Sequence, residues 1–260
     1  MDLPRLLMVE RGELWARIRI NRPDYRNAAN LETWEQLASV IQMLGSDPAV
    51  RTVIITGAGD RAFMAGADLS EFPEILQSPE RIAHYLAAIE SVISGIEGLQ
   101  KPVIAEINGA TMGGGLELAV ACDYRVAVPE ARFGIPSANL GVGITFKDVE
   151  RIVALVGLAT ARQLLLFSRV FTASEGVAKG FIDEIVAPER LRNRCEELAA
   201  ELADKAPKSI RSGKYAMNAI VHPGDSDLKM RALQSIHEAW NSDELKVRIN
   251  QFIQQRGSRS

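Results

Sequence analysis

Short apolar segments that alternate with helical patterns limit the folds open to this chain. Five of them are rich in β-branched residues or alternate apolar with polar side chains, and we expect strands at 14–20, 51–57, 101–109, 124–129 and 181–187. The spacing of apolar residues predicts helices at 31–44, 79–99, 148–156 and 159–167, with Gly45 ending the first of them. Such alternation is typical of an α/β core.

The composition and the apolar pattern of the chain change near residue 189. Beyond that point the sequence is more charged and shows helical patterns without further strand segments. We therefore expect an α/β core at 1–190 and a C-terminal helical region at 191–260. A length of 260 residues and a hydrophobic content of 47% allow one large domain with a substantial core.

Charge and cysteine content exclude several classes of protein. The formal net charge of −3 gives no electrostatic reason to expect a nucleic acid or an anionic membrane as a partner. Cys122 and Cys195 are too few for a disulfide scaffold, and Cys122 lies in an apolar run typical of buried packing. His84, His222 and His237 lack metal-ligand spacing, so we expect no metal and treat them as surface or packing residues. We find no targeting peptide and no apolar run that could span a bilayer, and we expect a cytoplasmic location.

Two loops of small residues each follow an expected strand. The first, TGAGDRAFMAGADL at 56–69, places Gly57 and Gly59 almost as a dinucleotide-binding fingerprint does. A second turn-like unit at 64–68 stands where that fingerprint begins a helix, so we favour a loop that exposes backbone N–H groups. The second loop, TMGGGLELAVACD at 111–123, has three successive glycines, which let a ligand or another backbone approach closely.

Free amides from two such loops, directed at one oxygen, would form an oxyanion hole. A hole of this kind stabilises a developing enolate by about 3 kcal/mol for each donor. The alternative is structural, with the glycines making tight turns and Asp68 capping a helix. The residue pattern of the loops leaves both interpretations open.

Glu117 favours the catalytic interpretation. It lies in the first turn of a helix whose other residues are apolar and require burial. Desolvation raises the pKa of a carboxyl group toward the range useful to a general acid or base. The alternative is a buried glutamate paired with an arginine, although Asp123, near the helix end, is better placed for a structural role.

Five stretches in a fixed order resemble one known family. They are RPDYRNA (22–28), FMAGADL (63–69), KPVIAEINGATMGGGLELAVACD (101–123), FGIP (133–136) and GFIDEIV (180–186). With them the chain resembles the crotonase, or enoyl-CoA hydratase/isomerase, superfamily. The resemblance implies an α/β fold built as a spiral of ββα units. It also implies a C-terminal helical region that drives formation of a homotrimer or a dimer of trimers.

The resemblance further implies an acyl-CoA substrate and roles for individual residues. The thioester oxygen would accept hydrogen bonds from the amides of Ala67 and Gly114, and Glu117 would be the general acid/base beside the acyl carbons. The implied substrate-binding residues are Arg26, Ala28, Ala65, Asp68, Leu69, Pro136, Ser137 and Gly141. Phe252, with Gln255 or Arg256, would close the adenine pocket. Coenzyme A is part of the substrate, so no separate cofactor is implied.

One position departs from the hydratases that the chain resembles. Their second glutamate follows FG-x-P, where this chain has Ser137, and a serine hydroxyl is no general base at neutral pH. This weakens concerted hydration by two carboxylates. Double-bond isomerisation, decarboxylation of a malonyl-type thioester, thioester hydrolysis and single-glutamate hydration stay open. The dehalogenase branch is disfavoured because its nucleophilic aspartate aligns with Thr145.

Two further alternatives concern the missing acid and the class of protein. Asp148 and Glu150 are the nearest spare acids, although a first-turn charge that favours the helix dipole is the stronger interpretation. A family member of this kind could also bind acyl-CoA, or RNA, without turning a substrate over. Glu117 argues against that alternative, because a binding protein needs no buried acid.

Overall fold

The computed structural model describes residues 6–257 and contains two β-sheets. The larger sheet has six strands in the order β1-β2-β3-β5-β7-β10, in which only β1 and β2 pair antiparallel. Its strands are β1 (Leu7–Arg11), β2 (Trp15–Ile20), β3 (Thr52–Gly57), β5 (Val103–Ile107), β7 (Tyr124–Ala127) and β10 (Glu184–Ile185). Its central strands β3 and β5 are buried along their whole length, as parallel strands covered on both faces require.

The smaller sheet gives the core its repeating plan. It has the order β4-β6-β8-β9 and consists of β4 (Ala62–Met64), β6 (Ala110–Met112), β8 (Arg132–Gly134) and β9 (Phe171–Thr172). Three times, a strand of the larger sheet leads to a strand of the smaller sheet and then to a helix. The predicted ββα units are therefore confirmed as β3-β4-α3, β5-β6-α4 and β7-β8-α6, with short turns of helix between strand and helix in the first and the last.

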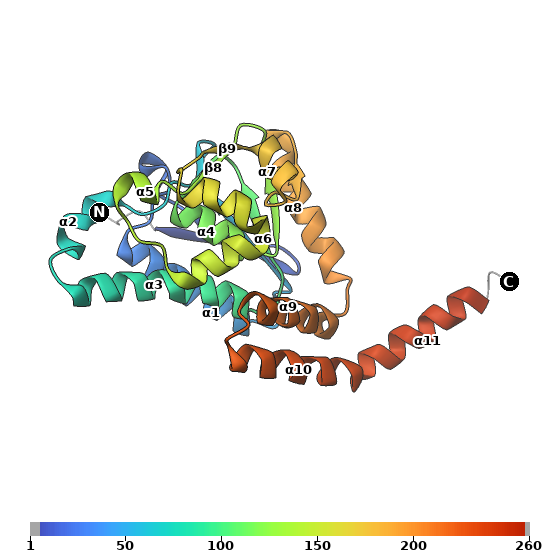
Figure 1. Ribbon diagram of the computed structural model, residues 1–260. Helices are drawn as coiled ribbons and strands as arrows, with labels where there is room; N and C mark the ends of the chain where they lie inside the picture. Colours follow the sequence, from blue (N-terminus) through green and yellow to red (C-terminus); the bar gives the residue numbers. More distant parts are fainter. Residues whose placement is uncertain (1–5, 258–260) are drawn as a thin grey trace.

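Helices surround and extend this core (Figure 1). They are η1 (Pro23–Tyr25), α1 (Leu31–Ser46), η2 (Leu69–Glu71), α2 (Phe72–Ile75), α3 (Pro79–Gly98), α4 (Gly114–Ala121), α5 (Ser137–Leu140), α6 (Phe146–Leu165), α7 (Ala173–Lys179), α8 (Pro188–Ala203), α9 (Pro207–Val221), α10 (Ser226–Trp240) and α11 (Asp243–Gly257). None of the helices in residues 6–257 is long and apolar enough to cross a membrane.

Two expected boundaries need correction. The helix α1 does not end at Gly45 but runs to Ser46, and Pro48, which follows the Asp47 cap, disfavours a longer helix. The strand expected at 181–187 shortens to β10, because Phe181 and Ile182 turn into the core, where they are 1% and 3% exposed. The two helices expected at 148–156 and 159–167 form the two arms of α6, which bends at Gly157.

The first helix beyond the strands belongs to the packing of the larger sheet. Leu191, Cys195 and Ala199 of α8 are buried in the same core cluster as the strands. Cys122 is likewise buried, and both thiols are free, so Cys122 packs as expected. The expected division between residues 190 and 191 falls in the first turn of α8. Further along, α9 packs on α10, and Figure 1 shows α11 running away from the rest of the molecule.

The glycines of α4 are explained by its position against the smaller sheet. A Cβ atom on Gly115 would lie 2.2 Å from the carbonyl oxygen of Met64 in β4. This contact is with backbone, which cannot move aside as a flexible side chain would. The close approach of α4 to β4 therefore requires a residue without a side chain at position 115.

We predict that Gly115→Ala lowers the free energy of unfolding by about 1–3 kcal/mol, the usual cost of overpacking. Gly213→Ala in α9 is the matched control, because nothing lies within 4 Å of its added Cβ atom. That control should raise the free energy of unfolding by about 0.5–1 kcal/mol, since alanine favours helix over glycine. Urea unfolding of both variants measures the difference, and equal stability of Gly115→Ala and the wild type would contradict the packing described.

Candidate active site

A pocket of about 200 Å³ lies between α1, α3, α4 and the segment that follows β8. It brings together the predicted residues Ala65, Ala67, Leu69, Gly114, Glu117, Pro136 and Ser137. The remaining lining residues are Trp34, Gly66, Phe72, Tyr85, Leu86, Ile89, Gly113, Ile135, Leu140, Val142 and Ile144. The pocket wall is thus mostly apolar, with Glu117 as its one carboxyl group.

The two glycine loops meet at one edge of this pocket. A Cβ atom on Gly66 would lie 2.8 Å from the carbonyl oxygen of Met112 and 3.5 Å from the nitrogen of Gly114. Gly66 and Gly113 also have φ values of 96° and 51°, a backbone region that favours glycine. The loops can approach this closely only because Gly66 carries no side chain, whereas at Gly113 it is the positive φ that favours glycine.

Two backbone amides at this meeting point are unused. The amide of Gly114 belongs to the first residue of α4, where no preceding turn offers an acceptor. A single β-bridge joins Ala67 to Ala29. Its two hydrogen bonds are donated by the amide of Asp68 to the carbonyl of Ala29 and by the amide of Ala29 to the carbonyl of Gly66, so the amide of Ala67 takes no part in it. Within residues 6–257, neither Ala67 nor Gly114 donates a backbone hydrogen bond. Both amides are therefore available to a ligand in the pocket.

Glu117 is buried beside these amides. Its side chain is 9% exposed, and its Oε2 atom lies 3.9 Å from the point where a Cβ atom on Gly114 would stand. Burial raises the pKa of this carboxyl group to about 8, helped by the negative charge of Asp148 and opposed by the positive charge of Arg151. No ion pair joins Glu117 to an arginine within the described residues, so the structural alternative is not supported.

The missing second acid is not replaced in the pocket. Ser137 is buried and begins α5, where the resemblance places the second glutamate of hydratases. The carboxylate of Asp148 lies 3.0 Å from Arg151 and accepts a hydrogen bond from the Thr145 hydroxyl. The carboxylate of Glu150 lies 3.1 Å from Nδ1 of His222. Neither acid lines the pocket, so both lie among polar partners outside it.

Arg151 makes ion pairs with three acids behind the pocket. Its guanidinium group lies 3.1 Å from a carboxylate oxygen of Glu90, 2.9 Å from one of Glu97 and 3.0 Å from one of Asp148. Glu97 also lies 3.2 Å from Nε2 of His222. These contacts link α3, α6 and the end of α9, and removal of one partner would leave a buried charge without compensation. His222 is a buried polar member of this cluster, a role that the sequence analysis did not assign to it.

Four predicted substrate-binding residues do not line the pocket. Asp68 makes an ion pair with Arg22 at 2.8 Å and caps η2 through the amide of Ser70, which is the structural role considered for it. Arg26 adopts a φ of 51°, and its carbonyl accepts a hydrogen bond from Ala65. Ala28 accepts one from Arg22, and Gly141 ends α5 with a φ of 73°. Their contact with coenzyme A stays a prediction.

One asparagine missed by the sequence analysis holds this loop. The side chain of Asn27 donates hydrogen bonds to the carbonyls of Ala58 and Ala62, and accepts one from the amide of Arg22. Asn27 has a φ of 58°, next to the left-handed Arg26. The link fastens the 22–28 loop to the segment between β3 and β4. In that segment the chain enters β4 and not a helix, so the dinucleotide interpretation has no structural support.

Side chains of the 70–90 segment, which were expected to shape the substrate channel, supply Phe72, Tyr85, Leu86 and Ile89 to the pocket wall. Leu86 and Ile89 belong to the apolar stripe expected on the 79–99 helix, but they line the pocket, whereas Ile93 and Ile96 of that stripe are in the core. Trp34 comes from α1, and no local pattern places its ring beside Gly114, where a Cβ atom on that glycine would lie 3.0 Å from the indole. Such contacts between distant segments follow from tertiary packing.

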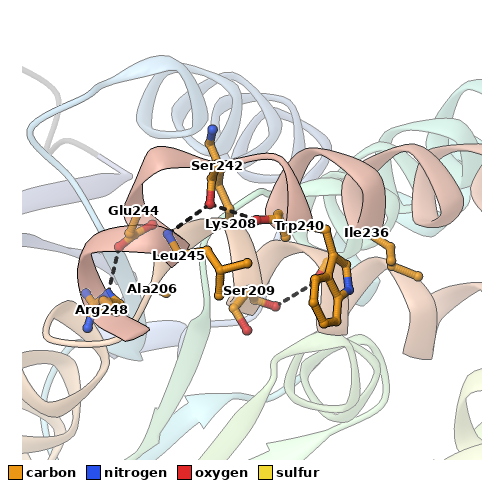
Figure 2. A pocket seen from close by; sticks show the side chains of 11 residues that line it. Ala206, Lys208, Ser209, Ile236, Trp240, Ser242, Glu244, Leu245 and Arg248 are labelled. Atoms are coloured by element: carbon orange, nitrogen blue, oxygen red, sulfur yellow. Dashed lines mark hydrogen bonds and ion pairs between the residues drawn. The ribbon is translucent and has the colours of Figure 1, made fainter. Parts of the chain in front are cut away.

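A second hollow lies among the C-terminal helices (Figure 2). It has a volume of about 310 Å³ and is lined by residues of α9, α10 and α11, among them Trp240. Its polar groups bond to one another: Arg248 pairs with Glu244 at 3.0 Å, and Ser242 accepts a hydrogen bond from the amide of Leu245. Among the described residues, no group of three or more His, Cys, Asp or Glu side chains is arranged to hold a metal.

The adenine contact stays a prediction. Phe252 lies on α11 and its side chain is 54% exposed, whereas the side chain of Arg256 falls outside the described residues. Gln255 lies on the same helix and is exposed.

We predict that the raised pKa of Glu117 appears in the pH dependence of stability. The folded protein holds a proton that the unfolded chain releases above its ordinary pKa of 4.5, so stability falls as pH rises from 4.5 to about 8. Relative to Glu117→Gln, the free energy of unfolding of the wild type should fall by up to about 1.4 kcal/mol per pH unit in this window. Urea unfolding at pH 5, 7 and 9 measures this, and a constant difference between the two proteins would contradict the burial of the carboxyl group.

Comparison with known proteins shows the family of this chain. The model of the enoyl-CoA hydratase/isomerase family matches residues 10–258. The chain is 33% identical over 256 residues to a short-chain-enoyl-CoA hydratase of Clostridium acetobutylicum, covering 98% of this chain and 97% of the relative. It is 37% identical over 212 residues to a crotonyl-CoA hydratase of Syntrophomonas wolfei, covering 82% and 81%.

Solved structures extend the likeness to the whole fold. An enoyl-CoA hydratase/carnithine racemase from Magnetospirillum magneticum superimposes with a TM-score of 0.88 at 27% identity, covering 97% of this chain and 94% of that one. An enoyl-CoA hydratase from Bacillus anthracis gives 0.84 at 28% identity, covering 96% and 97%. The ββα units, the helical C-terminal region and the matched sequence agree, and the chain is an acyl-CoA enzyme of the enoyl-CoA hydratase/isomerase family.

Proposed function

We propose that this enzyme moves a double bond in an enoyl-CoA thioester, with Glu117 carrying the proton. The observation that carries the proposal is the single carboxyl group of the pocket, which lies beside two unused amides. The thioester oxygen accepts hydrogen bonds from Ala67 and Gly114. Because both donors are held in place before reaction, they stabilise the negative charge that develops on that oxygen.

The proton transfer needs only one acid/base group. The Glu117 carboxylate removes a proton from carbon 2 of a β,γ-enoyl thioester, and the electron pair of that C–H bond forms the dienolate. The protonated Glu117 then donates the proton to carbon 4, which leaves the double bond between carbons 2 and 3. Coenzyme A enters and leaves as part of the substrate, and the scheme uses no other cofactor.

The pocket wall bears on the alternative reactions. No lysine or arginine lines the pocket, so the free carboxylate of a malonyl-type thioester would meet Glu117 without a compensating cation. Hydration is the second candidate, because the curated relatives in Clostridium and Syntrophomonas are named hydratases. Ser137 weighs against hydration in this chain, since it supplies no second base.

We further infer a homotrimer or a dimer of trimers. Apolar side chains are exposed along the C-terminal helices of one copy: Met217, Ile220, Met230, Leu233, Trp240, Val247, Ile249 and Ile253. Association of identical copies would cover this surface.

We predict conversion of 3-butenoyl-CoA to crotonyl-CoA, seen as a rise in the ultraviolet absorbance of the conjugated thioester. Glu117→Gln should lower kcat by a factor of about 10²–10⁴ while the protein still binds butyryl-CoA. The kcat/KM value should rise with pH and level off above about 8, because the ionised form of Glu117 is the base. Crotonyl-CoA, malonyl-CoA and release of free thiol are assayed in parallel. Fast loss of crotonyl-CoA absorbance without isomerisation would establish hydration, and unchanged turnover by Glu117→Gln would exclude Glu117 as the shuttle.

We predict that Ser137→Glu raises hydration of crotonyl-CoA by about tenfold or more, because it restores a second carboxylate to the pocket. Ser209→Glu, on the exposed surface of α9, is the matched control for the added charge. Hydration rates that are equal in Ser137→Glu and Ser209→Glu would show that the absence of the second acid does not limit that reaction.

A further inference from the structure

Two polar groups in the wall of the active-site pocket lack hydrogen-bond partners. Within the described residues, neither Nε1 of Trp34 nor the hydroxyl oxygen of Tyr85 makes a hydrogen bond. The two side chains are 0% and 6% exposed, and both line the pocket together with Glu117. The Trp34 indole N–H lies close enough to the Tyr85 oxygen to lower the pKa of Tyr85 as a hydrogen-bond donor does, although the pair does not reach full hydrogen-bond geometry. The hydroxyl proton of Tyr85 has no acceptor among the described residues.

The carboxylates nearest to Tyr85 do not accept its proton. Those of Glu71, Asp68 and Glu117 all act on the hydroxyl electrostatically. Glu71 accepts from the amide of Leu31 at 2.8 Å, and Asp68 is paired with Arg22. Burial raises the pKa of Tyr85 to about 12. The Trp34 indole opposes this rise, and the negative charges of the three carboxylates add smaller increases. The hydroxyl therefore keeps its proton and stays a donor.

Tyr85 has apolar neighbours in the pocket wall. Its ring packs edge-to-face on Phe72, with ring centroids 5.9 Å apart, and Leu86 and Ile89 of the same helix line the pocket beside it. A buried hydroxyl without a partner costs free energy, and such groups are rare in folded proteins unless a ligand or water completes them. A hydrocarbon chain would leave this cost in place, whereas an oxygen atom on the chain would remove it.

We propose that Tyr85 determines substrate specificity by donating a hydrogen bond to an oxygen atom on the acyl group. The pocket then selects hydroxylated short acyl chains over plain hydrocarbon chains of the same length. The inference rests on the proposed function only in placing the acyl group in this pocket. It does not depend on whether Glu117 first removes a proton from the acyl group or first donates one to it.

Binding of matched CoA thioesters tests the proposal. Calorimetric titration uses full-length protein carrying Glu117→Gln, so that no thioester is turned over. The ligands are butyryl-CoA, 3-hydroxybutyryl-CoA and freshly prepared 4-hydroxybutyryl-CoA. We expect at least one hydroxylated thioester to bind about tenfold more tightly than butyryl-CoA, the usual effect of one hydrogen bond to a buried, otherwise unpaired donor. Adding Tyr85→Phe should abolish that preference, so that butyryl-CoA and the hydroxylated thioesters bind with similar Kd values.

Tyr215→Phe is the matched control, because it removes a hydroxyl that bonds to the carbonyl of Gly98 outside the pocket. It should leave the preference intact. Thermal unfolding adds a second readout: Tyr85→Phe should be no less stable than its parent, since no hydrogen bond is lost, whereas a structural role for the hydroxyl would lower Tm. Butyryl-CoA binding without a preference for either hydroxylated thioester overturns the inference alone. A preference that survives Tyr85→Phe also overturns it. Failure of all three thioesters to bind overturns the placement of the acyl group as well, and with it the proposed function.

Discussion

The approach of two backbone loops to within contact distance at Gly66 and Gly113 is the constraint on which the rest of the site depends. It leaves the amides of Ala67 and Gly114 free and brings the first turn of α4 to the pocket. Glu117 reaches the pocket because it lies in that turn. A side chain at Gly66 would separate the loops, and the donors and the acid would no longer face one ligand.

Charges behind the pocket are arranged so that Glu117 remains without a direct partner. The positive charge of Arg151 lowers the pKa of Glu117, but its guanidinium group makes its ion pairs with Glu90, Glu97 and Asp148. The cluster joins α3 to α6 and, through His222, to the end of α9. A fold that paired Arg151 with Glu117 would stabilise the carboxylate and lower the pKa of the group, which would make it a weaker base.

Local pattern predicted the parts of this protein that depend on local physics. The strands around Ile54 and Ile104 and the burial of Glu117 follow from apolar spacing and β-branched residues. The ββα units came only from the family resemblance, because the short strands β4, β6, β8 and β9 carry too few residues to show a pattern of their own. Pairings between distant segments did not follow from local pattern either. Arg22 binds Asp68, which lies 46 residues further along the chain, and gives that acid a structural role. Trp34 and Tyr85 line the pocket from two separate helices. No spacing rule along the chain reports contacts that arise only when helices pack.

The pocket wall and the groups that we propose to take part in the reaction come from different parts of the chain. The amides of Ala67 and Gly114 and the side chain of Glu117 belong to loops and a helix that contact one another through backbone, where a side chain at Gly66 or Gly115 would clash. Phe72, Leu86, Leu140 and Val142 come from α2, α3 and the segment after β8, and Leu86, Leu140 and Val142 are exposed in a single copy. Mutation and selection can therefore remodel the choice of acyl group by changing these wall residues one at a time, while the chemistry is inherited unchanged.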